Sequence, residues 1–228
     1  MTPQEYFGDW SKVIDFDELK VVLGKLGQIN PEYLCPHPSN VFKAFKLCPY
    51  KELKVVFLGQ DPFPQKGIAT GILFGNEERT PEDKLSPSLE VIKECCINYE
   101  VPHGPIDFDI TLESWAKQGI LMINSALTCK VNEVGSHVML WRKFMINLIK
   151  NLSYRETGLL YVLFGGQAQT FEPYIDSRYN HIIKVEHPAY FARAKKIMPY
   201  SVFTDINKFL KDQYGETIQW YTETLNIN

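Results

Sequence analysis

Polar residues or glycines follow four apolar runs of this chain, at or just after the point where each run ends. They are Gln60 and Asp61 after 53–58, Asn124 at the end of 120–124, Gly165 and Gly166 after 159–164, and His187 after 182–186. A carboxylate, an amide and an imidazole are groups that acid–base and hydrogen-bonding chemistry uses. Taken singly, each has a structural explanation as a turn residue, a satisfied histidine or a helix entry. Taken together they predict a site, if the fold brings the four run ends to one place.

Asp61 lies in the stretch FLGQDPFPQKGIATGILF, residues 57–74, between an apolar run and a loop rich in glycine and proline. Strand ends that enter such loops are where open α/β sheets bind ligands, which favours a working carboxylate. Asp-Pro is also an ordinary turn signal, which favours a capping aspartate. The segment alone leaves both interpretations open.

The four apolar runs are short, β-branched or aromatic, and bounded by turn residues, which is typical of strands buried on both faces. Helical patterns lie between and after them, at 87–99, 111–119, 137–152, 167–175 and 201–215. This alternation predicts an α/β fold, a three-layer αβα sandwich with a central four-stranded, mostly parallel sheet. All four strand ends should then open on the same edge, where such sheets bind ligands.

Composition favours a globular chain folded as one domain over residues 1–228. Hydrophobic residues make up 45% of it and charged residues 22%, as in soluble proteins. Residues 1–50 add the helical stretches DELKVVLGKL and NVFKAFKL, which we interpret as an N-terminal elaboration of that domain. No run approaches the roughly 18 apolar residues that span a bilayer, and acids replace a basic leader at the N-terminus. We therefore expect an intracellular protein that is not secreted.

The sequence motifs of several functional classes are absent from this chain. The 5 cysteines include no CxxC pair, which argues against a disulfide framework, a zinc site or an iron–sulfur cluster. The chain has no GxGxxG after a strand, no GxxxxGK[ST], no GxSxG and no HExxH. The net charge of −3 removes the simplest argument for nucleic-acid binding. A local basic strip remains at ARAKK, 192–196, although such a run is more often a solvated surface.

The stretch GQDPFPQKGIATGILF resembles the catalytic loop of family 1 uracil-DNA glycosylases. Six further stretches resemble other motifs of this family and occur in the family's order. They are SPSL at 86–89, WAKQGILMINSALT at 115–128, GSH with Trp141 at 135–141, FGGQAQ at 164–169, HPAYFA at 187–192 and VFTDINKFL at 202–210. The resemblance runs from about residue 53 to 211. It implies hydrolysis of the N-glycosidic bond of uracil in DNA, by flipping the nucleotide into a pocket, as a step of base excision repair that leaves an abasic site.

The resemblance also implies site residues. They are Asp61 and His187 for catalysis, and Gln60, Phe63, Phe74 and Asn124 for binding the base. Phe74 would stack on the flipped ring, and Asn124 would pair with uracil N3–H and O4. Phe63 stands where the family usually has tyrosine and would exclude the methyl group of thymine. Asp61 would stabilise the cationic sugar and position water, while His187 donates to uracil O2. No metal and no cofactor is expected.

The residues implied for contact with DNA are Ser88, Gly166, His187, Ala189, Phe191 and Arg193. Phe191 replaces the leucine that enters the gap left by the flipped base. The family's histidine is Pro64 here, and serines that grip phosphates are replaced by Gly166, Ala189 and Ala192. Because hydroxyl donors are lost, we predict weaker or more salt-sensitive DNA binding, compensated in part by the basic strip.

Another interpretation remains open, namely a DNA-binding or polymerase-associated protein that kept the fold with weak or no catalysis. A glycosylase with altered base choice, such as thymine or hypoxanthine, is opposed by Asn124 and Phe63. Joint retention of Asp61, Phe74, Asn124 and His187 favours the enzyme. The expected partner is uracil-containing DNA, single- or double-stranded, with an inhibitor protein or a replication protein left open and no membrane. We expect a monomer, in the bacterial or phage cytoplasm or, for a eukaryotic or viral source, the nucleus or cytoplasm of the host.

Overall fold

The centre of the molecule is a four-stranded sheet in the order β4-β2-β6-β7, in which each neighbouring pair is parallel. The computed structural model describes residues 2–97 and 104–224. The strands of this sheet are β2 (Val55–Gly59), β4 (Ile120–Asn124), β6 (Leu160–Phe164) and β7 (His181–Val185). Gly59 pairs with Asn124, and Phe164 pairs with Val185, so the strand ends share one edge. The predicted fold class and common edge are confirmed.

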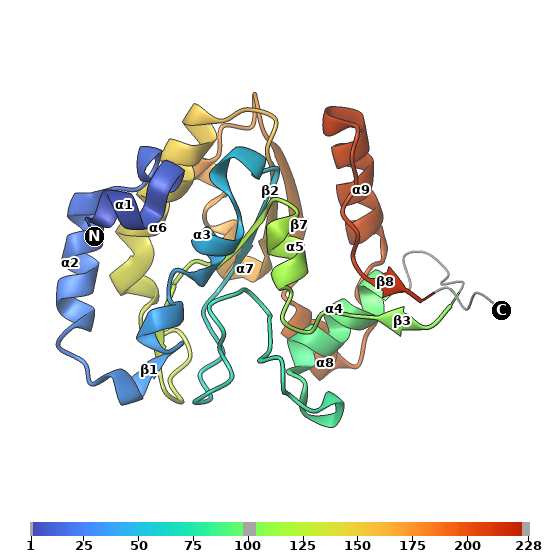
Figure 1. Ribbon diagram of the computed structural model, residues 1–228, viewed down its shortest axis with the longest axis horizontal. Helices are drawn as coiled ribbons and strands as arrows, with labels where there is room; N and C mark the ends of the chain where they lie inside the picture. Colours follow the sequence, from blue (N-terminus) through green and yellow to red (C-terminus); the bar gives the residue numbers. More distant parts are fainter. Residues whose placement is uncertain (1, 98–103, 225–228) are drawn as a thin grey trace.

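Helices cover both faces of this sheet. In Figure 1, α2 and α6 lie on one side of it and α9 lies on the other. The α-helices are α1 (Pro3–Phe7), α2 (Phe16–Leu26), α3 (Lys43–Leu47), α4 (Pro87–Ile97), α5 (Glu113–Lys117), α6 (Val138–Arg155), α7 (Gly165–Gln169), α8 (Pro188–Ala194) and α9 (Ser201–Tyr214). Short antiparallel pairs join β1 (Leu34–Cys35) to β5 (Cys129–Lys130) and β3 (Ile106–Asp107) to β8 (Thr222–Glu223).

The sequence forms these layers because its apolar residues are continuous in the strands and periodic in the helices. Strand β2 is buried at all five positions, as expected for a strand covered on both faces. Helix α6 instead buries one stripe, namely Trp141, Phe144, Met145, Leu148, Ile149, Leu152 and Ser153. This spacing of three and four residues turns one side of the helix towards the sheet.

The predicted helix over 167–175 is wrong in its bounds. Helix α7 ends at Gln169, and a separate 3-10 turn covers Glu172–Tyr174. Pro173 explains the break, because its ring is incompatible with a continued helix. Helix α8 was missed, although Pro188 occupies its first turn, where proline is tolerated. Residues 98 and 99 of the predicted helix 87–99 lie outside the described residues.

The N-terminal segment is attached to α6 by partly buried hydrogen bonds. Asn147 donates from Nδ2 to Asp15 Oδ2 at 2.8 Å, and Asn151 donates from Nδ2 to the carbonyl of Val13 at 3.1 Å. Within the segment itself, Trp10 donates from its indole nitrogen to the carbonyl of Cys48 at 2.9 Å. These contacts support the proposal that residues 1–50 elaborate the same domain.

All five cysteines are free and buried: Cys35, Cys48, Cys95, Cys96 and Cys129. Burial raises the pKa of each thiol, to about 12 for Cys48, Cys95 and Cys129. Within residues 2–97 and 104–224, none of the helices has the length and apolar character needed to cross a bilayer.

Candidate active site

A cavity of about 420 Å³ opens at the carboxyl edge of the sheet. It is lined by most of the residues predicted for the site, namely Gln60, Asp61, Phe63, Phe74, Ser88, Asn124, His187, Ala189 and Arg193. They come from the ends of β2 and β4, the segment after β7, the loop 60–74 and the helices α4 and α8. The topology thus gathers side chains that are far apart in the sequence.

Asp61 lies two residues after β2 and is held by a backbone donor. The N–H of Gly135 donates to Asp61 Oδ2 at 2.5 Å. Burial raises the pKa of the Asp61 carboxyl, while the Gly135 N–H and the Gln60 side chain lower it. A carboxylate in this position is partly dehydrated but keeps donors that stabilise its charge.

Asn124 ends β4, and its amide oxygen has no partner. The Oδ1 atom is buried and accepts no hydrogen bond from the described part of the chain. Gly59 lies beside it, and a Cβ at Gly59 would come within 2.7 Å of Oδ1. The glycine therefore leaves room for the amide of Asn124, a residue that lines the cavity and holds an unused acceptor. Such a group costs free energy unless something donates to it.

Phe74 is held against the end of β6 in an unusual backbone conformation. Its φ is 65°, which is rare for a bulky residue and indicates a constrained position. Its ring meets those of Phe164 and His187 edge to face, with centroids 5.2 and 5.6 Å apart. Phe74 is 4% exposed and lines the cavity.

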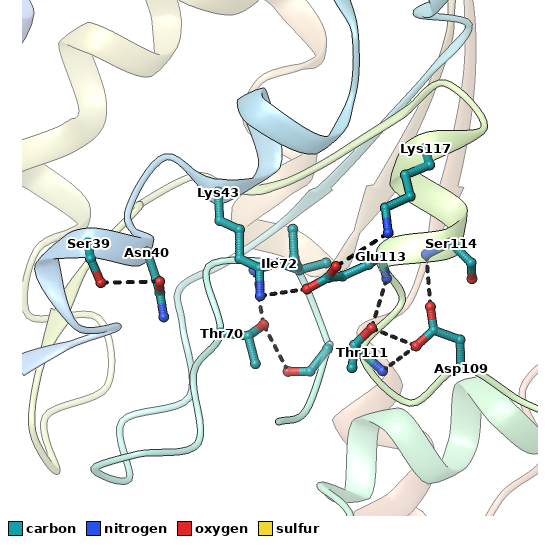
Figure 2. A network of polar contacts seen from close by, with 11 residues as sticks. Ser39, Asn40, Lys43, Thr70, Ile72, Asp109, Thr111, Glu113, Ser114 and Lys117 are labelled. Carbon is teal, nitrogen blue, oxygen red and sulfur yellow. Dashed lines mark hydrogen bonds and ion pairs between the residues drawn. The ribbon is translucent and has the colours of Figure 1, made fainter. Parts of the chain in front are cut away.

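A polar network holds the loop that carries Phe74, and Figure 2 shows part of it. Thr70 Oγ1 accepts from the N–H of Ile72 at 3.2 Å and donates to the carbonyl of Gly75 at 3.4 Å. A Cβ at Gly75 would lie 2.4 Å from the carbonyl oxygen of Thr111, so the loop packs directly on the segment before α5. That segment is fixed by Asp109, which accepts from Thr111 and Ser114.

His187 caps α8 and is neutral at physiological pH. Its Nδ1 accepts from the N–H of Ala189 at 3.1 Å, which leaves the proton on Nε2. Burial, and secondarily the charge of Arg193, lower the pKa of His187 to about 4. Gly165, with φ 82°, lets β6 approach closely, since a Cβ there would lie 2.9 Å from the Cβ of His187. The imidazole therefore offers one N–H donor.

Phe63 is half-buried on a loop that two thiols support. Cys35 donates from Sγ to the carbonyl of Pro64 at 3.4 Å, and Cys129 donates from Sγ to the carbonyl of Pro62 at 3.4 Å. Phe63 packs against a small cluster formed by Cys35, Ala69 and Cys129. Its ring is thereby held at the wall of the cavity.

Two predicted DNA-contact residues do not line the cavity. Gly166 is exposed in α7, with open space where a Cβ would lie. Phe191 is 8% exposed and belongs to the main core, so the interpretation of Phe191 as an exposed wedge does not fit its placement. The adjacent Tyr190, which is 40% exposed, is the outward aromatic of α8. Neighbours on a helix point about 100° apart, which the sequence alone did not resolve.

Sequence reasoning also missed the donor from Gly135. The stretch GSH was recognised as part of a motif, but nothing in its letters shows that a backbone N–H reaches Asp61 across 74 positions. In the described ranges 2–97 and 104–224, no group of three or more His, Cys, Asp or Glu side chains is arranged to hold a metal ion.

The fold and the site define an open α/β protein with a pocket at the carboxyl ends of its parallel strands. The chain belongs to the uracil DNA glycosylase superfamily, whose model matches residues 45–211. It is 32% identical to the uracil-DNA glycosylase of Fusobacterium nucleatum, over 96% of this chain and 97% of that protein. It is 34% identical to that of Alkaliphilus metalliredigens, over 94% and 95%.

Solved structures agree with the fold. The crystal structure of mimivirus uracil-DNA glycosylase matches with a TM-score of 0.71 at 24% identity, covering 96% of this chain and 93% of that one. A variant of mimivirus UNG in complex with UGI matches with a TM-score of 0.73 at 27% identity, covering 96% and 94%. Both structures share the fold over nearly the whole chain. The family model and the curated relatives confirm the resemblance identified from six motifs.

Proposed function

We propose that this chain hydrolyses the N-glycosidic bond of uracil in DNA, which releases free uracil and leaves an abasic site for base excision repair. The observation that carries this proposal is the buried, unpartnered Oδ1 of Asn124 in a pocket that also contains Asp61 and His187. The named relatives support the same activity.

The base must leave the duplex to reach this pocket. A stacked base is inaccessible to enclosed side chains, so the nucleotide is flipped out and bound alone. Phe74 then stacks on the ring of the base, because any pyrimidine offers a flat apolar face. The constrained backbone of Phe74 keeps the ring in place before the base arrives.

Asn124 selects uracil by its hydrogen-bonding pattern. Its free Oδ1 accepts from uracil N3–H, and its amide nitrogen donates to O4. Cytosine presents a bare N3 and an amino group at these positions, so both contacts would be mismatched. An unpaired polar group in such a pocket costs about 1–3 kcal/mol, and two mismatches therefore discriminate strongly.

Asp61 and His187 divide the chemistry between sugar and base. As the bond between C1′ and N1 breaks, the sugar becomes cationic and the bonding electron pair leaves with uracil. Asp61 stabilises the cation and positions the water that attacks C1′, while the neutral His187 donates from Nε2 to O2 of the departing anion. Backbone N–H groups near Gln60 supplement this donor.

Phe63 excludes thymine by occupying the space that its methyl group requires. Thymine matches uracil at N3 and O4, so Asn124 cannot distinguish them. A ring held at the wall of the pocket can, and Phe63 is supported by the small cluster containing Cys35 and Cys129.

Contact with DNA falls to the rim of the pocket. Ser88, Ala189 and Arg193 line it, and Lys195 and Lys196 extend the basic surface beyond α8. We assign to Tyr190 the position near the vacated base step, because it is exposed where Phe191 is buried. Few hydroxyl donors remain, so binding relies on charge and falls steeply with salt.

A protein partner is also part of this proposal. Because a mimivirus UNG variant is described in complex with UGI, an inhibitor protein is a partner class to examine for this chain. Action as a monomer inside the cell is the simplest arrangement that fits the proposed substrate.

The decisive experiment offers the protein a uracil-containing oligonucleotide and cleaves abasic sites with alkali. Strand cleavage with the wild type, and its loss by about 10²–10⁴-fold in Asp61→Asn with uracil-DNA binding retained, supports the enzyme. Binding without cleavage by the wild type supports instead a DNA-binding module. Equal activity of Asp61→Asn would remove Asp61 from the mechanism.

A further inference from the structure

A chain of three buried polar side chains lies behind the pocket and takes no part in the proposed chemistry. Trp141 donates from Nε1 to Thr128 Oγ1 at 2.8 Å, and Thr128 Oγ1 lies 2.9 Å from His137 Nδ1. All three side chains are buried. The hydroxyl of Thr128 can accept from the indole and still donate to, or accept from, Nδ1, so the direction of the second contact follows the tautomer of His137.

This chain ends at the turn that supplies the donor to Asp61. His137 is the N-cap residue of α6, and Gly135 two positions earlier donates its N–H to Asp61 Oδ2 at 2.5 Å. The turn is tied at a second point, since the N–H of Lys130 donates to Ser136 Oγ at 2.8 Å.

Apolar packing and hydrogen bonding both tie this turn to the core. Val134 within the turn is 66% exposed, while Val138, next to His137, is partly buried against the main core. The contact of the buried His137 with Thr128 adds a polar restraint between the turn and the core. A restraint of this kind sets where the Gly135 N–H points.

We propose that Thr128 and His137 are positioning residues, and that the buried Trp141–Thr128–His137 chain holds the turn 133–137 so that the Gly135 N–H meets one oxygen of Asp61. This inference deepens the proposed function and rests on it. With Oδ2 occupied by the backbone donor, the other carboxylate oxygen of Asp61 is left for the sugar cation and the water.

A test follows from the acid side of the pH profile, because an N–H donor favours the ionised carboxylate. Loss of the donor raises the pKa of Asp61, and the acid limb of kcat moves to higher pH. The other titratable groups near Asp61 are the Cys129 thiol on β5, His187 after β7 and Arg193 on α8. They are unchanged in the variants.

The first comparison is Thr128→Val against Thr128→Ser. Valine keeps the shape but removes the hydroxyl, and we expect kcat to fall about tenfold, with little change in KM and an acid limb at higher pH. Serine keeps the hydroxyl, and we expect it to restore both kcat and the acid limb.

Ser153→Ala is the matched control. Ser153 is a buried hydroxyl on the same helix as Trp141 and accepts from the N–H of Asp176 at 2.6 Å, away from the pocket. We expect this variant to lose stability but to keep the wild-type acid limb. The proposal is overturned if Thr128→Val and Ser153→Ala, compared at equal loss of stability, have the same kcat and the same acid limb.

Gly135→Ala is the alternative variant for this test if Thr128→Val does not fold. Gly135 has a φ of 74°, and no atom lies within 4 Å of the place that a Cβ would occupy, so alanine strains the turn without a clash. The same shift of the acid limb is expected, and its absence overturns the proposal. If the wild type excises no uracil, the proposed function fails; if it does and no variant shifts the acid limb, only the positioning role fails.

Discussion

The Nδ1 atom of His187 accepts a hydrogen bond from the N–H of Ala189 at 3.1 Å, so the histidine caps its own helix with one nitrogen and faces the pocket with the other. The contact requires a neutral ring, and burial lowers the pKa of His187 to about 4. The side chain is therefore a donor whose charge is constant over the neutral range.

The low pKa of His187 predicts how stability changes with pH. An unfolded histidine has a pKa of about 6.5, so between about pH 4 and 6.5 the unfolded chain binds the extra proton and stability rises with pH. In His187→Gln, unfolding midpoints at pH 5 and pH 7 should differ less than in the wild type. His37→Gln, at an exposed position, is the control and should keep the wild-type difference.

Asn124→Asp should shift excision from uracil towards cytosine. The introduced carboxyl can accept from the cytosine amino group, whereas the amide nitrogen of asparagine is itself a donor and cannot pair with that group. Alkali-labile cleavage of cytosine- and uracil-containing strands measures the ratio of the two rates, and a thymine strand serves as the negative control. An unchanged preference for uracil would contradict the role assigned to Asn124.

Phe63→Ala should admit thymine. Removal of the ring opens the wall of the pocket, while Phe63→Tyr keeps the ring and should still exclude the methyl group. Rates of thymine release from a duplex distinguish the two variants. If alanine also excludes thymine, a different side chain blocks the methyl group.

Phe191→Ala and Tyr190→Ala should differ in kind. Phe191 belongs to the core, so its truncation should destabilise the fold by about 3–5 kcal/mol, measured by urea unfolding. Tyr190 is exposed, so its truncation should leave stability nearly unchanged and weaken binding to uracil-containing duplex. If Phe191→Ala bound the duplex more weakly and kept its stability, Phe191 would be the residue that enters the vacated base step.

Strand and helix alternation was enough to predict the sheet, because the strands are buried on both faces and read as continuous apolar runs. Polar residues at the strand ends were enough to predict where the pocket lies. The two-residue strands β1 and β5 were missed, since two residues carry no period. Their pairing matters because it brings Cys35 and Cys129 under the loop of Phe63.

Two details of the site were out of reach of sequence reasoning for a common cause. The resemblance implied that Phe191 enters the gap left by the flipped base, but the rotation of a seven-residue helix places Phe191 inward and Arg193 outward. The contact of Gly135 with Asp61 joins backbone to side chain across the fold, and no residue type encodes it. Such details depend on tertiary packing rather than on local pattern.

The burial of all five thiols makes the protein suited to site-specific labelling. With raised pKa values, these cysteines form little thiolate at neutral pH and should react slowly with maleimides. Val134, exposed and lining the pocket, can then be replaced by cysteine to carry a fluorophore. Changes in emission would report the arrival and departure of an extruded nucleotide in real time.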